Sequence, residues 1–202
     1  MLIVNKPSGM LSQKASESDI SLNESILSYL IHEGLLSEET YAVFHPSVAN
    51  RLDRNTSGIV LAGKTLAGQQ FLSDILRDRS AKKIYHCIVR GKVEEEMHLK
   101  GYLLKDERSN QVQIFSDETQ DAKPIETAYR PLVVGPDATL LEVHLITGRS
   151  HQIRAHLASI GHPIAGDPKY GDMVWNKKLR QDFSVRSQLL HAYSITLPDG
   201  RT

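Results

Sequence analysis

The chain has 202 residues, of which 40% are hydrophobic and 24% charged, and its 24 lysines and arginines are matched by 24 acidic residues. These proportions exclude a wholly disordered chain, and the length suits one domain with a sizeable core. A single cysteine, Cys87, excludes a disulfide framework and a thiolate-rich zinc site, and it fits a reducing compartment. Apolar runs such as Ile59–Ala62 are too short to span a bilayer and no secretory signal is visible, so we expect a soluble, cytoplasmic protein.

Zero net charge hides an uneven distribution of charge along the chain. Residues 51–92 carry 9 basic and 3 acidic side chains and residues 143–202 carry 8 and 4, whereas residues 93–142 carry 5 and 11. A polyanion responds to local fields, so the two basic blocks could form one positive face. Taken alone, the pattern is more simply explained as solvated surface charge.

The N-terminal part of the chain predicts a strand and then a helix. Leu2–Val4 is strand-like and runs into a turn signal at residues 6–9. The spacing of apolar residues predicts a helix over 21–36, where Ser21 and Glu24 have the spacing of a capping box.

The remainder mixes helices and strands. Thr65 can cap a second helix, and a third is predicted from about Ser150 to the Gly161 stop signal. Alternating apolar residues predict further strands at 83–89, 111–115, 125–134, 139–146 and 189–196, with a hairpin turn at 135–137 and an exposed turn at 94–96. No regular βαβ rhythm is present, which indicates the α+β class.

A carboxylate between two arginines marks the first candidate site, at residues 50–58, which the strand-like run Ile59–Ala62 follows. Asp53 stands between Arg51 and Arg54, whose guanidinium groups would keep it ionised. An ionised carboxylate can act as a nucleophile or as a general base. Taken alone, the simpler interpretation is an Asp that caps or salt-bridges a loop.

A second candidate segment, residues 147–157, places two arginines, two histidines and a glutamine at a helix start. Helix N-termini attract anions, so phosphate or a carboxylate would suit this position. Histidines at 144, 151, 156 and 162 raise the question of zinc. However, 151 and 156 do not share a helical face and no HExxH motif is present, so we predict no metal site.

Tyr85 is the third candidate, because it lies in the middle of a predicted strand beside several basic residues. Its ring could stack on a nucleobase. It could equally be a core residue whose hydroxyl has found a partner, which is the commoner case.

Six segments, in this order, resemble pseudouridine synthases of the RluA type. They are residues 5–9 (NKPSG), 51–58 (RLDRNTSG), 82–85 (KKIY), 147–157 (TGRSHQIRAHL), 161–171 (GHPIAGDPKYG) and 189–193 (LLHAY). Each alone would be weak evidence, but six in register over nearly the whole chain are highly specific.

The resemblance implies one catalytic domain, residues 1–202. Its fold would be a mixed, mostly antiparallel, bifurcated sheet with flanking helices and loops and an active-site cleft between the two halves. By the same resemblance, Asp53 is the catalytic aspartate, Tyr85 the active-site tyrosine, and Arg154 the arginine that pairs with the aspartate.

Four residues are assigned to substrate binding. By resemblance, Arg51 fills the gap left by the flipped uridine, and Ile153 helps to wall the pocket. Arg149 and Gln152 belong to the same motif as Arg154, and we expect them to bind substrate too. The target uridine must leave its helix or loop, as enzymes that act on bases generally require.

The implied reaction is the isomerisation of a uridine in RNA to pseudouridine. The glycosidic bond breaks, the base rotates, and C5 bonds to C1′, so no metal or other cofactor is needed. Asp53 must be ionised and positioned, which pairing with Arg154 would achieve, and Tyr85 could stack on the base and later act as an acid or base. Three first steps stay open for the carboxylate: attack at C1′, addition at C6, or removal of a 2′ proton.

Two departures from the family pattern are visible. The family usually has His before the Arg-Leu-Asp sequence, whereas this chain has Asn50, which puts any hydrogen bond of that histidine in doubt. The sequence also begins directly at the predicted catalytic domain, so we expect it to lack the small S4-type domain that many relatives carry.

Two alternatives to an RNA-uridine isomerase stay open. One is a catalytically silent RNA-binding or RNA-folding protein on the same scaffold, against which the intact Asp53, Tyr85 and Arg154 argue. The other is a hydrolase, which would need a second carboxylate, and Asp167 could approach in space. We expect a monomer whose partner is ribosomal or transfer RNA, with no membrane association.

Overall fold

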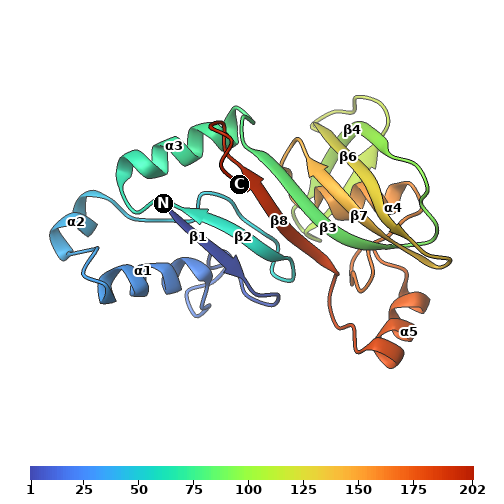
Figure 1. Cartoon of the computed structure of the whole chain (residues 1–202), viewed down its shortest axis with the longest axis horizontal. Coiled ribbons are helices and arrows are strands. Elements are labelled where there is room, and N and C mark those ends of the chain that lie inside the picture. Colours follow the sequence, from blue (N-terminus) through green and yellow to red (C-terminus); the bar gives the residue numbers. More distant parts are fainter. The chain divides into compact units, whose positions relative to one another are not determined.

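The computed structural model describes residues 1–202, and its contacts form two compact units. Unit 1 comprises Met1–Ala81 and Ile195–Thr202, and unit 2 comprises Lys82–Ser194. The elements, coloured along the chain in Figure 1, are β1 (Leu2–Lys6), α1 (Leu22–His32), α2 (Glu38–Val43), β2 (Ser57–Ala62), α3 (Leu66–Arg77), β3 (Lys82–Arg90), β4 (Met97–Asp106), β5 (Gln111–Phe115), β6 (Lys123–Val134), β7 (Ala138–Leu145), α4 (Gln152–Ser159), α5 (Met173–Phe183) and β8 (Leu190–Thr196). None of the helices has the length and apolar character that a membrane span needs.

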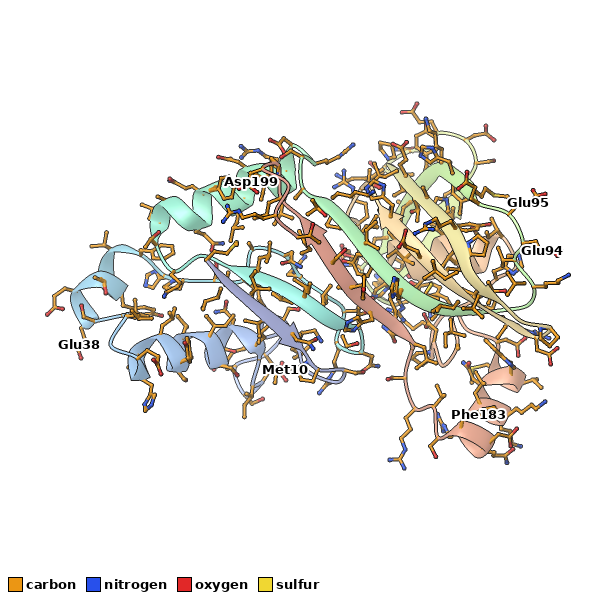
Figure 2. All side chains as sticks on the ribbon, viewed as in Figure 1. Met10, Glu38, Glu94, Glu95, Phe183 and Asp199 are labelled. Carbon is orange, nitrogen blue, oxygen red and sulfur yellow. The ribbon has the colours of Figure 1, made fainter.

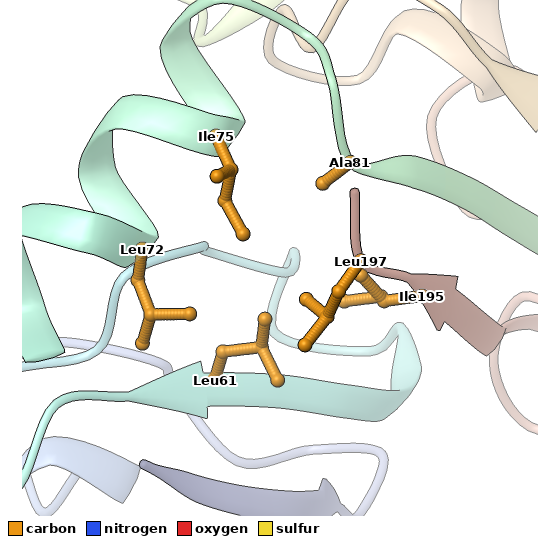
Figure 3. Packing of buried hydrophobic residues seen from close by; sticks show 6 residues of the cluster. All are labelled: Leu61, Leu72, Ile75, Ala81, Ile195 and Leu197. Atoms are coloured by element: carbon orange, nitrogen blue, oxygen red, sulfur yellow. The ribbon is translucent and has the colours of Figure 1, made fainter. Parts of the chain in front are cut away.

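Unit 1 is built on the antiparallel pair β1–β2, which runs from Leu2 opposite Ala62 to Lys6 opposite Gly58. The amphipathic helix α3 packs on β2 and buries Leu72 and Ile75. Figure 3 shows the resulting core cluster, which contains Leu61, Leu72, Ile75, Ala81, Ile195 and Leu197. This core supports the strand that follows the Asp53 loop.

The helix caps in unit 1 follow the sequence signals. Ser21 and Glu24 form the predicted capping box of α1, and the Thr65 hydroxyl accepts a hydrogen bond from the Gly68 N–H at the start of α3. The prediction of a helix to residue 36 was wrong, because α1 ends at His32. Gly34 takes a left-handed conformation, with φ of 66°, and reverses the chain there.

In unit 2 the strands lie in the order β8-β3-β7-β6-β4-β5. Of β8, the residues up to Ser194 belong to this unit. The pairs β3–β7, β7–β6, β6–β4 and β4–β5 are all antiparallel. The hairpin predicted at 135–137 is confirmed, since the Gly135 N–H donates to the Ala138 carbonyl over 2.9 Å. Helix α4 packs against β5 and β6, where Ala155 joins a core cluster with Leu103, Val112 and Ile125.

Three elements were not predicted from the sequence, namely α2, β4 and α5. Helix α5 buries none of its side chains, and Phe183 at its end is 71% exposed (Figure 2). Residues 94–96, predicted as an exposed turn, are indeed exposed but form a loop with a bend at residue 95, on which Figure 2 labels Glu94 and Glu95.

Candidate active site

The Asp53 loop of unit 1 is held through its main chain. The buried Ser12 hydroxyl donates to the Leu52 carbonyl over 2.9 Å and accepts from the Leu52 N–H over 3.0 Å. On the other side, the Thr56 N–H donates to the Asp53 carbonyl over 3.0 Å and closes a turn. Hydrogen bonds therefore restrain the backbone on both sides of Asp53, and they limit the positions that its carboxylate can take.

Lys6 ties the 5–9 segment to this loop. Its side chain is fully buried, and Nζ donates to the carbonyls of Pro7 (3.0 Å), Met10 (2.8 Å) and Arg54 (3.1 Å). Burial lowers the pKa of Lys6 to about 8, although the nearby charge of Asp53 acts to raise it. Sequence reasoning did not single out Lys6, but its place in the NKPSG segment was a signal that it holds the chain beside Asp53.

Replacing Lys6 by Met should destabilise the protein and loosen the Asp53 loop, because three buried carbonyls lose their donor at about 1–3 kcal/mol each, offset in part by the removal of a buried charge. Folded Lys6 releases its proton near pH 8, whereas the unfolded chain keeps it until about pH 10.5. The stability contribution of Lys6 therefore rises with pH across this window. Urea unfolding at pH 7 and pH 9.5 should show that the free energy of unfolding of the wild type rises relative to that of Lys6→Met as the pH rises. A difference between the two proteins that stays constant would contradict the lowered pKa of Lys6.

Asn50, where the family usually has His, has a structural position. Its Nδ2 donates to the Ile59 carbonyl over 3.2 Å, and its Oδ1 accepts from the Leu61 N–H over 2.8 Å. The side chain thus pairs with two main-chain groups of β2, much as another strand would. Asn50 thereby links β2, through hydrogen bonds, to the segment that leads into the Asp53 loop.

Tyr85 lies in the middle of β3 in unit 2 and is only 7% exposed. Val143 of β7 stands opposite both Tyr85 and Tyr129, so the three side chains share one face of the sheet. Thr127, two residues before Tyr129, accepts a hydrogen bond from Gln152 of α4. Tyr85 therefore lies on the face that α4 covers, whereas its neighbour His86 points to the opposite face and stacks on Tyr193 at 3.9 Å.

Arg154 of α4 forms a buried ion pair with Asp167. Nε donates to Oδ2 over 2.7 Å and Nη2 to Oδ1 over 2.9 Å, and the two side chains are 5% and 0% exposed. Burial opposes ionisation, but Arg154 and the N–H groups of Lys169 and Tyr170 hold the pKa of Asp167 below its usual value. A carboxylate held ionised in this way is unsuited to act as the second carboxylic acid of a hydrolase.

The other residues assigned to the site differ in their surroundings. Gln152 is buried, and its side chain hydrogen-bonds Thr147, Thr127, the Glu126 carbonyl and the Arg149 N–H, so it braces the start of α4. Ile153 is 4% exposed. Arg149 and Arg51 are both exposed and lie on loops.

Three of the four histidines considered for zinc have separate hydrogen-bond partners. Nδ1 of His151 bonds the Tyr170 hydroxyl, that of His156 bonds the Thr127 hydroxyl, and that of His162 bonds the Arg90 carbonyl. Burial lowers the pKa of His156 to about 4, so this ring is neutral at pH 7. No group of three His, Cys, Asp or Glu side chains is arranged to hold a metal ion.

Comparison with known proteins places these residues in a family. The family model described as RNA pseudouridylate synthase matches residues 1–159, which include Asp53, Tyr85 and Arg154. The chain is 36% identical over 203 residues to ribosomal large subunit pseudouridine synthase C of Haemophilus ducreyi, a match that covers 100% of this chain and 60% of that relative. It is 33% identical over 206 residues to tRNA pseudouridine synthase C of Vibrio cholerae, covering 96% of this chain and 80% of that relative.

The fold has a solved counterpart. The structure of human RNA pseudouridylate synthase domain containing 4 matches with a TM-score of 0.75 at 21% identity, covering 97% of this chain and 80% of that one. The α+β class and the family expected from the six segments are thereby confirmed. The chain belongs to the RNA pseudouridylate synthase family.

Proposed function

We propose that this chain isomerises specific uridines in RNA to pseudouridine. The family match over residues 1–159 carries this proposal, because it spans Asp53, Tyr85 and Arg154 together. Relatives that share about a third of its residues are named as synthases, which favours an active enzyme over a silent RNA-binding protein. One relative is named for ribosomal RNA and the other for transfer RNA, so both are candidate substrates.

In the proposed reaction Asp53 acts first, as a nucleophile or as a base. The C1′–N1 bond breaks, the base turns, a C1′–C5 bond forms, and the proton on C5 is lost while N1 gains one. Tyr85 stacks on the base and exchanges the proton at carbon, and Arg154 is the charge partner of the carboxylate. Arg51 takes the place of the flipped uridine, while Ile153 walls the pocket and Arg149 and Gln152 support substrate binding.

The proposed reaction has no net redox change, so the chain's own side chains suffice without a cofactor or a metal. We further propose that the enzyme works as a monomer in the cytoplasm. The names of its bacterial relatives support this location, because ribosomal and transfer RNA are found there.

The test uses the purified chain and RNA labelled with tritium at C5 of uridine. An isomerase releases tritium to water without releasing uracil, whereas a glycosidase releases labelled uracil. Mapping pseudouridines across total RNA, with and without the gene, then identifies the RNA and the position. No tritium release from ribosomal or transfer RNA would contradict the proposal.

RNA affinity should depend on the basic run around the end of α3 despite zero net charge. Changing Arg77, Arg79, Lys82 and Lys83 together to Gln should weaken binding of all RNAs and flatten the salt slope by about 0.7–0.9 for each phosphate that is no longer neutralised. Turnover in the saturated complex should change little. Filter binding at 50 and 200 mM salt measures the effect.

A matched variant changes four basic residues of the acidic block, Lys100, Lys105, Arg108 and Lys123, to Gln. It alters the net charge equally and should lose less affinity. Equal losses in the two variants would show that net charge, and not this run, governs binding.

A further inference from the structure

We propose that helix α5 of unit 2 is a docking element for the RNA substrate, which binds phosphates and one unstacked base beside the target uridine. The inference rests on the proposed function, in which the substrate is RNA. It gives a role to residues 172–188, which lie between the segments 161–171 and 189–193 and which the proposed reaction does not use.

Helix α5 exposes apolar side chains that a folding role would bury. Five large apolar side chains of the chain are at least 70% exposed, and three of them, Met173 (70%), Val174 (82%) and Phe183 (71%), belong to this helix. No residue of α5 is fully buried, and in Figure 1 the helix stands away from the sheet of unit 2. Large apolar groups gathered on an exposed element indicate a binding surface.

The charges around these apolar groups are complementary to a polyanion. Residues 172–188 contain four basic side chains and two acidic ones, and one of the acidic residues, Asp172, is already paired with Arg90 of β3. All four basic side chains are exposed, namely Lys177, Lys178, Arg180 and Arg186. Cations combined with accessible aromatic rings are typical of surfaces that bind single-stranded nucleic acid, which favours RNA as the occupant.

The helix directs its lysines away from the rest of unit 2. Three residues of α5, Trp175, Asn176 and Leu179, are half-buried and mark the side that faces the unit. Lys177 and Lys178 fall on the opposite half of the helix and are exposed. Both ammonium groups are therefore accessible to a phosphate backbone.

Side-chain hydrogen bonds hold the first turn of α5 in place. The Asp172 carboxylate accepts from the Trp175 N–H over 2.7 Å and so caps the helix. Asn176 accepts from the Gly166 N–H over 2.8 Å and donates to the Asp167 carbonyl over 2.9 Å. A surface that is ordered before RNA binds loses less conformational entropy on docking.

These hydrogen bonds also place α5 close to the proposed active site. Asp167, whose carbonyl Asn176 binds, is the ion-pair partner of Arg154. From Asn176 to Phe183 the helix extends about 10 Å, which three stacked nucleotides would cover at about 3.4 Å each. We therefore expect α5 to contact nucleotides near the target uridine, with its cations at phosphates and Phe183 against a base.

The first test changes Lys177, Lys178 and Arg180 together to Gln in the full chain, with the RNA substrate identified by the tritium assay. Filter binding from 50 to 400 mM salt should show a salt slope smaller by about 2, because each phosphate contact on a single strand contributes about 0.7. KM should rise about 10-fold or more, whereas kcat should change less than about 3-fold, because the lost contacts act in binding.

A matched control changes Lys100, Lys123 and Arg130, three exposed basic residues of β4 and β6, to Gln. It removes the same charge from unit 2 and should alter the salt slope and KM less. A variant that exchanges Lys and Arg at the three α5 positions keeps the charge and should retain the wild-type slope. Equal losses in the two Gln variants, or a wild-type slope and KM for the α5 variant, would overturn the proposal.

Phe183→Ala tests the stacking contact separately. The Kd for RNA should rise about 5-fold or more while the salt slope keeps its wild-type value, because stacking neutralises no phosphate. Tyr41→Ala is the control, since Tyr41 is a 41% exposed aromatic residue of α2 and should not affect the Kd. An unchanged Kd for Phe183→Ala would overturn the base contact.

The two proposals fail in different ways. If the wild type releases no tritium from any RNA, the proposed function is wrong. If the wild type is active and the α5 variants bind and convert RNA as it does, only the docking role is wrong, and the exposed surface of α5 would fit a protein partner instead.

Discussion

Asp53→Asn should abolish isomerisation, lowering turnover by about 10³-fold or more, while RNA affinity and folding stay close to wild type. The amide keeps the shape of the carboxylate but lacks the ionised oxygen that we propose starts the reaction. The bonds that Ser12 and Lys6 make to this loop go to main-chain atoms, so the loop should keep its conformation. Tritium release at saturating RNA, with binding measured separately, tests this.

The matched control is Asp199→Asn, an exposed carboxylate of the same unit that pairs with Arg201 over 2.6 Å. It makes the same chemical change away from the proposed chemistry and should leave turnover unaffected. Appreciable isomerisation by pure Asp53→Asn protein would remove Asp53 as nucleophile or base. A loss of RNA affinity equal to the loss of turnover would assign it to binding.

Arg154→Met should lower both activity and stability. Activity falls because the proposed charge partner of the catalytic carboxylate is lost. Stability falls because Asp167, which is fully buried, is left without its cation, at a cost of about 3–5 kcal/mol. Urea unfolding at pH 7 gives the stability change, and tritium release at a temperature where the variant is folded gives the activity.

Arg130→Met provides the comparison, since it removes an arginine of unit 2 that pairs with Glu142 over 2.7 Å at a partly exposed position. Such a pair contributes about 1 kcal/mol or less, and no change in turnover is expected. A similar stability loss for both variants would mean that burial of the Arg154 pair has no special cost. Full activity of folded Arg154→Met would exclude Arg154 from the chemistry.

Elements with a buried face were predictable from the sequence. The apolar stripe of α3 and the alternation of β3, β6 and β7 each record a side that packs on a core, and Ser21 and Thr65 marked the helix starts. Those signals are local, because each capping hydrogen bond and each apolar repeat lies within a single segment of the chain. They were sufficient for the α+β class.

The three elements that were not predicted either lack a fully buried face or have one whose sequence pattern is interrupted. Helices α2 and α5 have no fully buried side chain, so neither presents a fully buried apolar face. In β4 the buried positions include Gly101, which interrupts the alternation. A Cβ there would lie 2.9 Å from the Phe115 carbonyl oxygen of β5, so the glycine is required by a neighbouring strand. This requirement could not be read from the segment alone.

The sequence by itself determined the family and indicated the residues proposed for the chemistry, because the motifs around Asp53, Tyr85 and Arg154 are contiguous stretches of chain. Only the tertiary structure decided what holds them. Lys6 reaches the carbonyl of Arg54, 48 residues away, and Asp167 binds Arg154 across 13 residues. Buried charges must find partners wherever the fold brings them, and no local pattern records that choice.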